Sequence, residues 1–209
     1  PVINLVRKLG ITSDMPEMPS IALGTADATV FQMVGAYGTF ANEGVYVKPV
    51  LVTRIEDKNG TVLFENTPET HDVVSAEVAR AVVNLMEGVT RYGSGARLRT
   101  KGAETYNAIY KNVMTGYPYQ FTNPIAGKTG TTQNNSDGWF IGMVPNLVTG
   151  VWVGGEDRAI HFRTTAYGQG ATMALPVFGY YMKKCYADKD LNVSKGAFPA
   201  PQNKEIPID

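Results

Sequence analysis

The chain has 209 residues, of which 44% are hydrophobic and 18% are charged, the proportions of an ordinary soluble globular protein. Its 19 basic and 19 acidic residues cancel at neutral pH, so the composition offers no basic surface for nucleic acid or for an anionic membrane. The single cysteine, Cys185, excludes an intrachain disulfide, and His71 and His161 have no ligand residues at metal-site spacing.

The first half of the chain alternates predicted helices with a hairpin. Apolar residues at a spacing of three and four predict helices, β-branched residues around a turn sequence predict the hairpin, and Thr29 and Ser75 are the predicted N-caps. The predicted elements are a helix over residues 2–9, a Pro-rich loop, a helix from 30 to 43, extended segments at 45–55 and 61–64 joined by a turn at 57–60, a helix over 76–91 and a loop over 100–122.

Three strands and a helix are predicted in the second half. The strands cover residues 124–131, 139–143 and 147–154, and their short connections require antiparallel neighbours. A last amphipathic helix, with Thr172 as its expected cap, carries Cys185 on its apolar face as a small core residue. Residues 197–209 are Pro-rich and are expected to be irregular. No linker or repeat divides the chain, so residues 1–209 are interpreted as one unit.

The string Gly127-Lys128-Thr129-Gly130-Thr131 has two interpretations. A phosphate-binding loop requires a glycine five residues before the Gly-Lys-Thr, and that position is Thr122. Such a loop would also open a helix, whereas another strand follows here. The pairs Gly93-Ser-Gly95 and Gly168-Gln-Gly170 lack the third glycine of a dinucleotide loop and are typical of turns. We therefore reject nucleotide binding and predict no cofactor and no metal.

As a strand at the rim of a cleft, the same string suits an anionic substrate. Thr129 and Thr131 share one face, where their hydroxyls can hold a carboxylate, and Lys128 adds a positive charge. Gly130 leaves room for an extended peptide to pair with the strand, and the N–H of Thr131 then points at the oxyanion of an acyl transfer. Taken alone, the tetrapeptide is more typical of a turn or a solvated strand end.

The surroundings of this string add a family resemblance. The chain resembles the penicillin-binding proteins, especially the bifunctional class A enzymes of peptidoglycan synthesis, whose third signature is Lys-Thr-Gly. The resemblance covers most of the chain, as the C-terminal part of a transpeptidase domain. It rests on the segments 127–132, 137–142 and 151–155, on Leu23-Gly24 with residues 36–44, on 89–96 with its Tyr-Gly-Ser-Gly-Ala, and on 168–176.

The resemblance implies an α+β fold, an antiparallel sheet with helices on both faces that is incomplete in this chain. It also implies a D,D-transpeptidase in which a serine attacks the D-Ala-D-Ala amide of a peptidoglycan stem peptide, with β-lactams acylating the same serine. Lys128 and Thr131 would be catalytic, and Lys128, Thr129, Gly130 and Thr131 would bind substrate. The implied location is the periplasmic side of the bacterial inner membrane, with an N-terminal anchor and a glycosyltransferase domain outside this chain.

The chain departs from the family pattern in one respect. No serine in it begins Ser-x-x-Lys or Ser-x-Asn, so the family's nucleophile, its lysine base and the serine of its middle motif are not present. Because the chain starts at Pro1 rather than Met, we expect it to be part of a longer protein, with the missing half as a partner that could be another chain, and we expect it to be inactive alone. The alternatives are a D,D-carboxypeptidase or β-lactamase, and a non-catalytic β-lactam sensor or substrate-binding module.

Several other residues have two interpretations. Trp139 and Phe140 could form the floor of a substrate groove, although a buried strand pair is the simpler interpretation. Asp137 could orient Lys128 or close a turn, and we favour the turn. His161 could meet substrate, and two arginines, Arg91 and Arg97, could help to hold a carboxylate, but solvated surface is the simpler expectation for all three.

Overall fold

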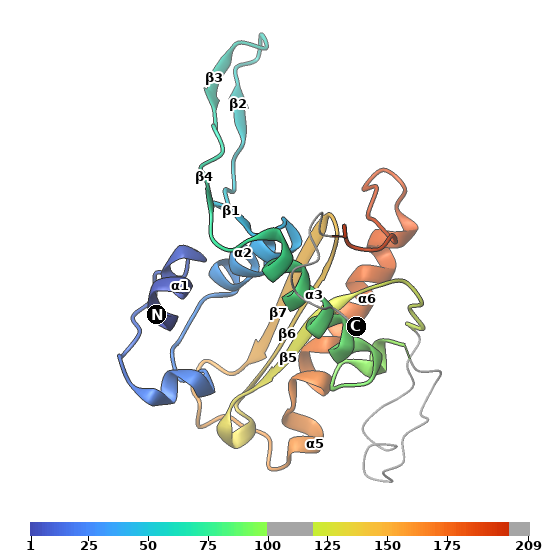
Figure 1. Ribbon diagram of the computed structural model, residues 1–209. Coiled ribbons are helices and arrows are strands. Elements are labelled where there is room, and N and C mark those ends of the chain that lie inside the picture. The colour runs from blue at the N-terminus through green and yellow to red at the C-terminus, as the bar shows by residue number, and fades with distance from the viewer. Residues whose placement is uncertain (100–118, 201–209) are drawn as a thin grey trace.

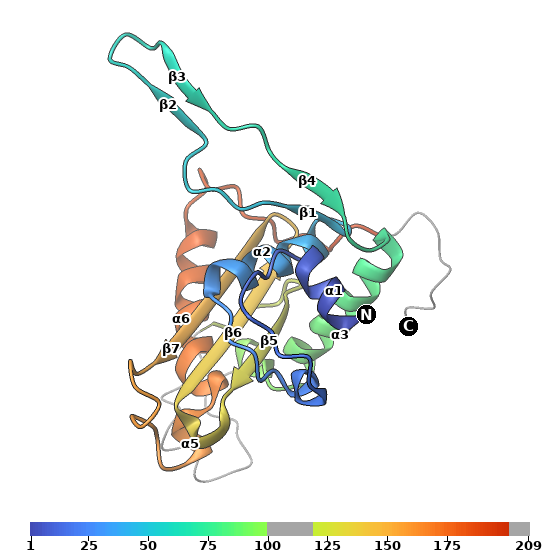
Figure 2. The ribbon, with the colours of Figure 1, turned by 90° about the vertical axis from the view of Figure 1, so that its left-hand side faces the viewer.

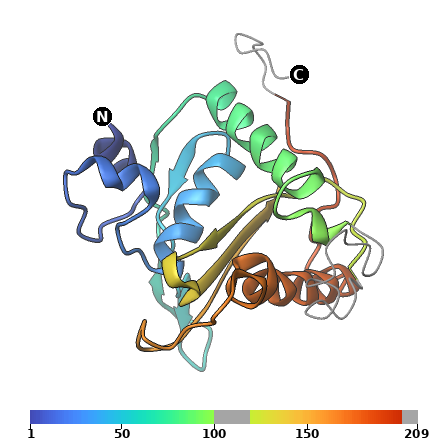
Figure 3. The same cartoon turned by 90° about the horizontal axis from the view of Figure 1, so that it is seen from below.

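The computed structural model describes residues 1–99 and 119–200. It confirms the predicted α+β class: a three-stranded antiparallel sheet lies between helices on both faces, and a ribbon of short strands projects from it (Figures 1 to 3). The elements in chain order are α1 (Val2–Lys8), η1 (Pro19–Leu23), α2 (Val30–Ala41), β1 (Val45–Val47), β2 (Arg54–Glu56), β3 (Val62–Glu65), β4 (Thr70–Asp72), α3 (Ala76–Arg91), η2 (Ala96–Leu98), β5 (Ala126–Thr131), η3 (Gln133–Asn135), β6 (Asp137–Val144), β7 (Leu147–Gly154), α5 (Thr165–Gly168) and α6 (Gly170–Ala187).

The sheet has the order β5-β6-β7, with both pairs antiparallel, as the short connections predicted. Strand β6 begins at Asp137, two residues before the predicted start. The cause is a closed turn, because the N–H of Thr132 bonds the Asp137 carbonyl at 3.2 Å and the N–H of Asp137 bonds the Thr132 hydroxyl at 3.1 Å. All of β6 except Trp139 is buried, which is why its sequence shows no apolar–polar alternation.

Alternate residues of β6 face two different layers. Figure 3 shows these layers, with α6 on one face of the sheet and α2 and α3 on the other. Phe140 faces α6, and its ring centroid lies 4.8 Å from that of Phe178. Met143 faces the other way and packs with Val83 of α3. Helix α2 covers the same side. Its Val34 packs closely against β7, because a Cβ atom on Gly150 would lie 2.6 Å from a methyl carbon of Val34. The sheet is therefore fixed from both sides.

The predicted N-caps of α2 and α3 are confirmed. Thr29 and Gln32 form a reciprocal capping box, and Ser75 accepts from the N–H of Val78. The predicted cap of the last helix is wrong, because α6 begins at Gly170 with Gln169 as its N-cap, and the Thr172 hydroxyl instead donates to the Ala166 carbonyl. None of the helices within the described ranges is long and apolar enough to cross a bilayer.

The hairpin prediction was correct in its turn and incomplete in its strands. Asp57 and Gly60 close the turn, but residues 45–55 form two short strands instead of one. Strand β1 pairs with β4, which was not predicted, and β2 pairs with β3 across a register shift at Ile55/Glu56. This ribbon, residues 45–72, projects away from the sheet (Figure 2). Large apolar side chains on it, such as Leu51 and Leu63, are exposed.

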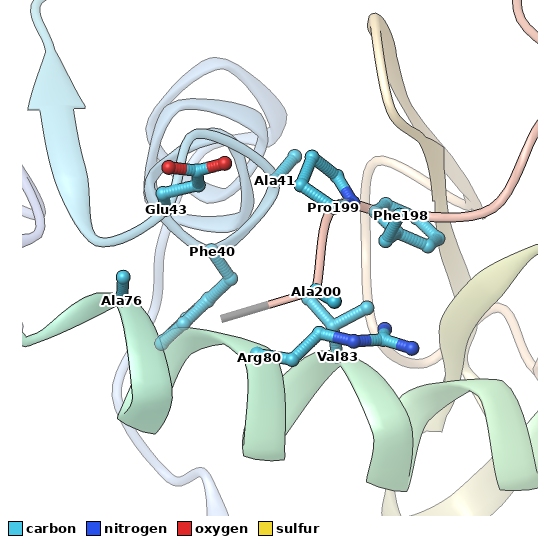
Figure 4. Close-up of a pocket in the computed structure, with 9 residues that line it drawn as sticks. All are labelled: Phe40, Ala41, Glu43, Ala76, Arg80, Val83, Phe198, Pro199 and Ala200. Atoms are coloured by element: carbon cyan, nitrogen blue, oxygen red, sulfur yellow. The ribbon is translucent and has the colours of Figure 1, made fainter. Parts of the chain in front are cut away.

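The described part of the C-terminal tail returns to the body of the protein. Its residues 197–200 have no regular structure, yet Phe198 is buried among residues of α2 and α3, on the sheet face opposite α6. The Arg80 guanidinium lies 5.9 Å from the centroid of the Phe198 ring. Figure 4 shows the small pocket that remains there, lined by Phe40, Ala41, Glu43, Ala76, Arg80, Val83, Phe198, Pro199 and Ala200.

Candidate functional site

Strand β5 has one open edge within the described residues, because its only partner there is β6. The bond from the Thr132 N–H to the Asp137 carbonyl fixes which residues of β5 bond inward. In an antiparallel pair the bonded positions alternate, so the N–H and C=O groups of Thr129 and Thr131 point away from β6, toward the open edge. An extended peptide could therefore pair with these two residues.

The threonine hydroxyls lie on the face of β5 that α6 covers. In register Thr129 is opposite Phe140 and Thr131 is opposite Gly138, which both face α6. The Thr129 hydroxyl lies 2.6 Å from that of Ser94, and the Thr131 hydroxyl accepts the Gly170 N–H at 3.0 Å. The second contact sets Thr131 beside the first turn of an 18-residue helix, whose dipole makes that end partly positive.

Gly170 can make this contact because it has no side chain. A Cβ atom there would lie 2.2 Å from the Gly130 carbonyl oxygen and 2.3 Å from that of Trp139. On the facing strand, a Cβ atom on Gly138 would lie 2.9 Å from the Gly170 Cα. The two glycines let the N-terminus of α6 meet the backbone of the sheet, which also explains why α6 starts here.

Lys128 is exposed, and the alternation of the strand directs its side chain to the face opposite Thr129 and Thr131. Its ammonium donates to the Thr129 carbonyl at 2.8 Å, so the charge lies at the open edge of β5. Gly130 was predicted to leave room for a peptide. It also leaves room for Trp139, because a Cβ atom at position 130 would lie 3.0 Å from the Cβ of Trp139.

Ser94 is held over Thr129 by the Gly-Ser-Gly turn that ends α3. The N–H groups of Gly93 and Gly95 both bond the Val89 carbonyl, at 3.1 Å and 3.0 Å. A Cβ atom on Gly95 would lie 3.5 Å from the Phe140 ring, so the turn lies directly over the residue paired with Thr129. Three residues on, Leu98 is buried in the core beside α6.

The base of β5 is fixed by a buried polar network. The Thr90 hydroxyl donates to the Ile125 carbonyl at 2.6 Å and accepts from Arg99 at 3.0 Å. Arg99 also bonds the carbonyls of Phe121 and Asn123. Burial, followed by the nearby charge of Arg91, lowers the pKa of Arg99. The segment that leads into the Lys-Thr-Gly-Thr strand is thus anchored to α3.

Three of the other candidate residues lie on β6, where Trp139 and Phe140 are paired with Gly130 and Thr129 and Asp137 bonds Thr132. Phe140 is fully buried and Trp139 half-buried, and Asp137 closes the turn through its backbone, as favoured. The exposed His161 ring lies 3.1 Å from the Phe162 carbonyl oxygen.

The two arginines considered for carboxylate binding have other partners. Arg91 pairs with the buried Glu87 at 2.8 Å, and Arg97 donates to the Ala171 carbonyl and the Thr172 hydroxyl of α6. These bonds tie the residues around the Gly-Ser-Gly turn to α3 and α6, a role that the sequence interpretation did not assign to them.

Three contacts at the site were missed from sequence: those made by Ser94, by the Gly170 N–H and by Thr90. Ser94 and Thr129 are 35 residues apart, so no local spacing joins them. A usable signal was present, because small Gly-containing strings at 93–95 and 168–170 indicate close backbone approach. Within the described ranges, no group of three or more His, Cys, Asp or Glu residues could hold a metal ion.

Comparison with known proteins identifies first the fold and then the family. The fold is that of penicillin-binding proteins. Its coordinates superpose on penicillin-binding protein 1A from Haemophilus influenzae with a TM-score of 0.73 at 22% identity, over 94% of this chain and 32% of that chain. They superpose on the PonA1 protein of Mycobacterium tuberculosis in complex with penicillin V with a TM-score of 0.69 at 26% identity, over 97% of this chain and 52% of that chain.

The family follows from the sequence comparison. Residues 17–171 match the penicillin binding protein transpeptidase domain, so the chain belongs to that family. It is 33% identical over 92% of its length to penicillin-binding protein 1A of Aquifex aeolicus and 31% identical over 73% of its length to penicillin-binding protein 2D of Bacillus subtilis. The chain spans 24% and 20% of those two proteins. The predicted resemblance to class A penicillin-binding proteins is confirmed.

Proposed function

We propose that this chain supplies the carboxylate-binding strand of a serine D,D-transpeptidase that cross-links peptidoglycan stem peptides. The observation that carries the proposal is the geometry of β5, where two threonine hydroxyls share one face and two N–H groups point to an open edge. A stem peptide ending in D-Ala-D-Ala would add as a strand along this edge. Its terminal carboxylate would accept hydrogen bonds from Thr129 and Thr131.

The same arrangement suits the acyl-transfer step. The outward N–H of Thr131 is a preformed donor for the oxyanion that develops when a serine attacks the peptide carbonyl. The positive end of α6, which reaches the Thr131 hydroxyl through Gly170, favours the negative charge of the bound carboxylate. β-Lactams, which carry a carboxylate beside a strained amide, would use the same contacts.

The role of Lys128 depends on whether a peptide is bound at the open edge of β5. In the empty strand its ammonium bonds the Thr129 carbonyl, which is one of the groups that an added strand would use. Substrate pairing releases the ammonium to face the cleft. There it would act as a point charge that helps the serine of the middle motif to relay a proton.

The nucleophile lies outside these 209 residues, because no serine here begins Ser-x-x-Lys. We propose that the remainder of the protein supplies it, and that the complete enzyme works on the periplasmic side of the inner membrane. The isolated chain should then form no covalent adduct with penicillin, whereas a stoichiometric adduct seen by mass spectrometry on this chain alone would contradict the proposal.

The threonine contacts are tested in the complete protein with Thr129→Val and Thr131→Val. Each change removes one hydrogen bond to a charged group, worth about 1.5–3 kcal/mol, so the rate of acylation by penicillin should fall about 10- to 150-fold. Lys128→Ala should slow acylation with little effect on thermal unfolding. Valine variants that react within about twofold of the parent would remove these residues from the site.

A further inference from the structure

We propose that Ser94 is a positioning residue, whose hydroxyl donates to Thr129 and turns the Thr129 proton toward the substrate carboxylate. The inference rests on the proposed function of β5 and extends it to a residue outside the Lys-Thr-Gly-Thr string. It starts from one distance, the 2.6 Å between the two hydroxyl oxygens, which is short for a hydrogen bond between hydroxyls.

The direction of this bond follows from what each hydroxyl can do. A hydroxyl has a single proton and two lone pairs, and either oxygen could be the donor in the empty site. If Thr129 donated to Ser94, it would present lone pairs to an incoming carboxylate. A bound carboxylate therefore selects the arrangement in which Ser94 donates to Thr129 and Thr129 donates to the ligand. Hydrogen bonds in such a chain strengthen one another.

Thr131 shows the same arrangement with a different donor. Its hydroxyl oxygen accepts the Gly170 N–H at 3.0 Å, which leaves its proton free to point outward. Each threonine hydroxyl thus accepts one hydrogen bond from the protein, Thr131 from the backbone of α6 and Thr129 from Ser94. The backbone N–H is kept by every substitution except proline, whereas Ser94→Ala removes the serine donor.

Ser94 is suited to this part because its backbone is fixed while its side chain is exposed. The flanking Gly93 and Gly95 N–H groups are both bonded to the Val89 carbonyl, and Gly95 is buried against Phe140. The side chain of Ser94 itself is solvent-accessible at the open end of the strand. Substitution there should leave the core unchanged, so an effect on acylation can be assigned to the hydroxyl.

The test uses the complete protein, with benzylpenicillin and its methyl ester as probes and the acyl adduct measured by mass spectrometry. Ser94→Ala should slow acylation by benzylpenicillin about 3- to 10-fold, the size of one neutral hydrogen bond, and should leave the methyl ester rate within about twofold. Ser94→Thr, which keeps the hydroxyl, should restore the benzylpenicillin rate. Combined with Thr129→Val, Ser94→Ala should cause no further loss, because it acts through Thr129.

The matched control is Ser194→Ala, which deletes a hydroxyl that accepts the Gly196 N–H in the tail and should change neither rate. Equal slowing of both probes by Ser94→Ala would indicate a structural role and overturn the inference, as would a benzylpenicillin rate equal to that of the parent. A parent protein that neither probe acylates would overturn the proposed function itself, so the two failures are distinguishable.

Discussion

Phe178 in α6 and Phe64 in β3 have the same side chain in two regions that are built very differently. Phe178 is fully buried against the sheet, whereas Phe64 is 46% exposed on the projecting ribbon. The sheet is packed between helices on its two faces, and glycines bring backbones into contact. In the ribbon, paired strands are held by their turn and by surface ion pairs. The site stands at the end of the first region, where the supporting side chains leave its geometry little freedom.

The largest difference between the two regions is expected when the two phenylalanines are truncated in turn. Phe178→Ala should lower the free energy of unfolding by about 3–5 kcal/mol, because it leaves a cavity beside Phe140. Phe64→Ala should cost less than about 1 kcal/mol, because its ring is half in water already. Urea unfolding followed by tryptophan fluorescence measures both, and equal losses would show that the ribbon is part of the core.

A smaller effect is expected from a pair of glycines. Gly170→Ala places a methyl group against the carbonyls of Gly130 and Trp139, and overpacking of this kind costs about 1–3 kcal/mol. In helix α2, a Cβ atom on Gly38 would meet nothing within 4 Å, so Gly38→Ala should stabilise the protein by up to about 1 kcal/mol. If Gly170→Ala proved as stable as the parent, the close contact between α6 and the strand would be wrong. Thermal unfolding measures whether each substitution raises or lowers the stability of the protein.

The polar anchor at the base of β5 can be compared with a threonine of the ribbon. Thr90→Val removes the hydroxyl between Ile125 and Arg99 and should cost about 1–2 kcal/mol, because a buried carbonyl loses its partner. Thr70→Val in the exposed strand β4 should change stability by less than about 0.5 kcal/mol. Hydrogen exchange at Ala126 and Gly127 should accelerate only in Thr90→Val, and unchanged exchange there would argue against the anchor.

The smallest effect concerns the ribbon turn and its dependence on pH. The Asp57 carboxylate accepts the N–H groups of Thr61 and Asn59, and these bonds lower its pKa below the ordinary value. The ionised form therefore stabilises the folded turn above the ordinary pKa, and this contribution is lost as the pH falls through the lowered pKa. The protection factor of the Thr61 amide, its exchange rate corrected for the intrinsic dependence on pH, should fall across that acidic range in the parent and stay constant in Asp57→Asn. The same pH dependence in the parent and in Asp57→Asn would show that the Asp57 carboxylate does not stabilise the turn.

Features set by neighbouring residues were predictable from the sequence, and features set by distant ones were not. The caps at Thr29 and Ser75 and the three strands follow from local spacing, and the fold class follows from the family resemblance that the local motifs carry. The start of α6 was misplaced because it depends on the fit of Gly170 against strands about 30 to 40 residues earlier. The burial of Phe198 likewise depends on a groove between α2 and α3 that no local pattern reveals.

The same distinction between local and distant residues holds for the candidate site. Alternation along a strand placed Thr129 and Thr131 on one face, and the structure agrees with that placement. Their polar partners, Ser94 and the Gly170 N–H, come from segments joined only by the fold. The predicted loop at 100–122 lies mostly outside the described residues, since only 119–122 belong to them. The roles proposed for Lys128, Thr129, Gly130 and Thr131 stay predictions.

The central claim, that the tip of β5 holds the carboxylate of the substrate, is tested most directly by a crystal structure of the complete protein acylated by penicillin. The carboxylate oxygens should lie about 2.5–3.0 Å from the hydroxyl oxygens of Thr129 and Thr131. The acyl oxygen should accept the Thr131 N–H, and the Lys128 ammonium should have left the Thr129 carbonyl. A carboxylate held elsewhere, with both threonine hydroxyls bonded only to Ser94 and Gly170, would contradict the account.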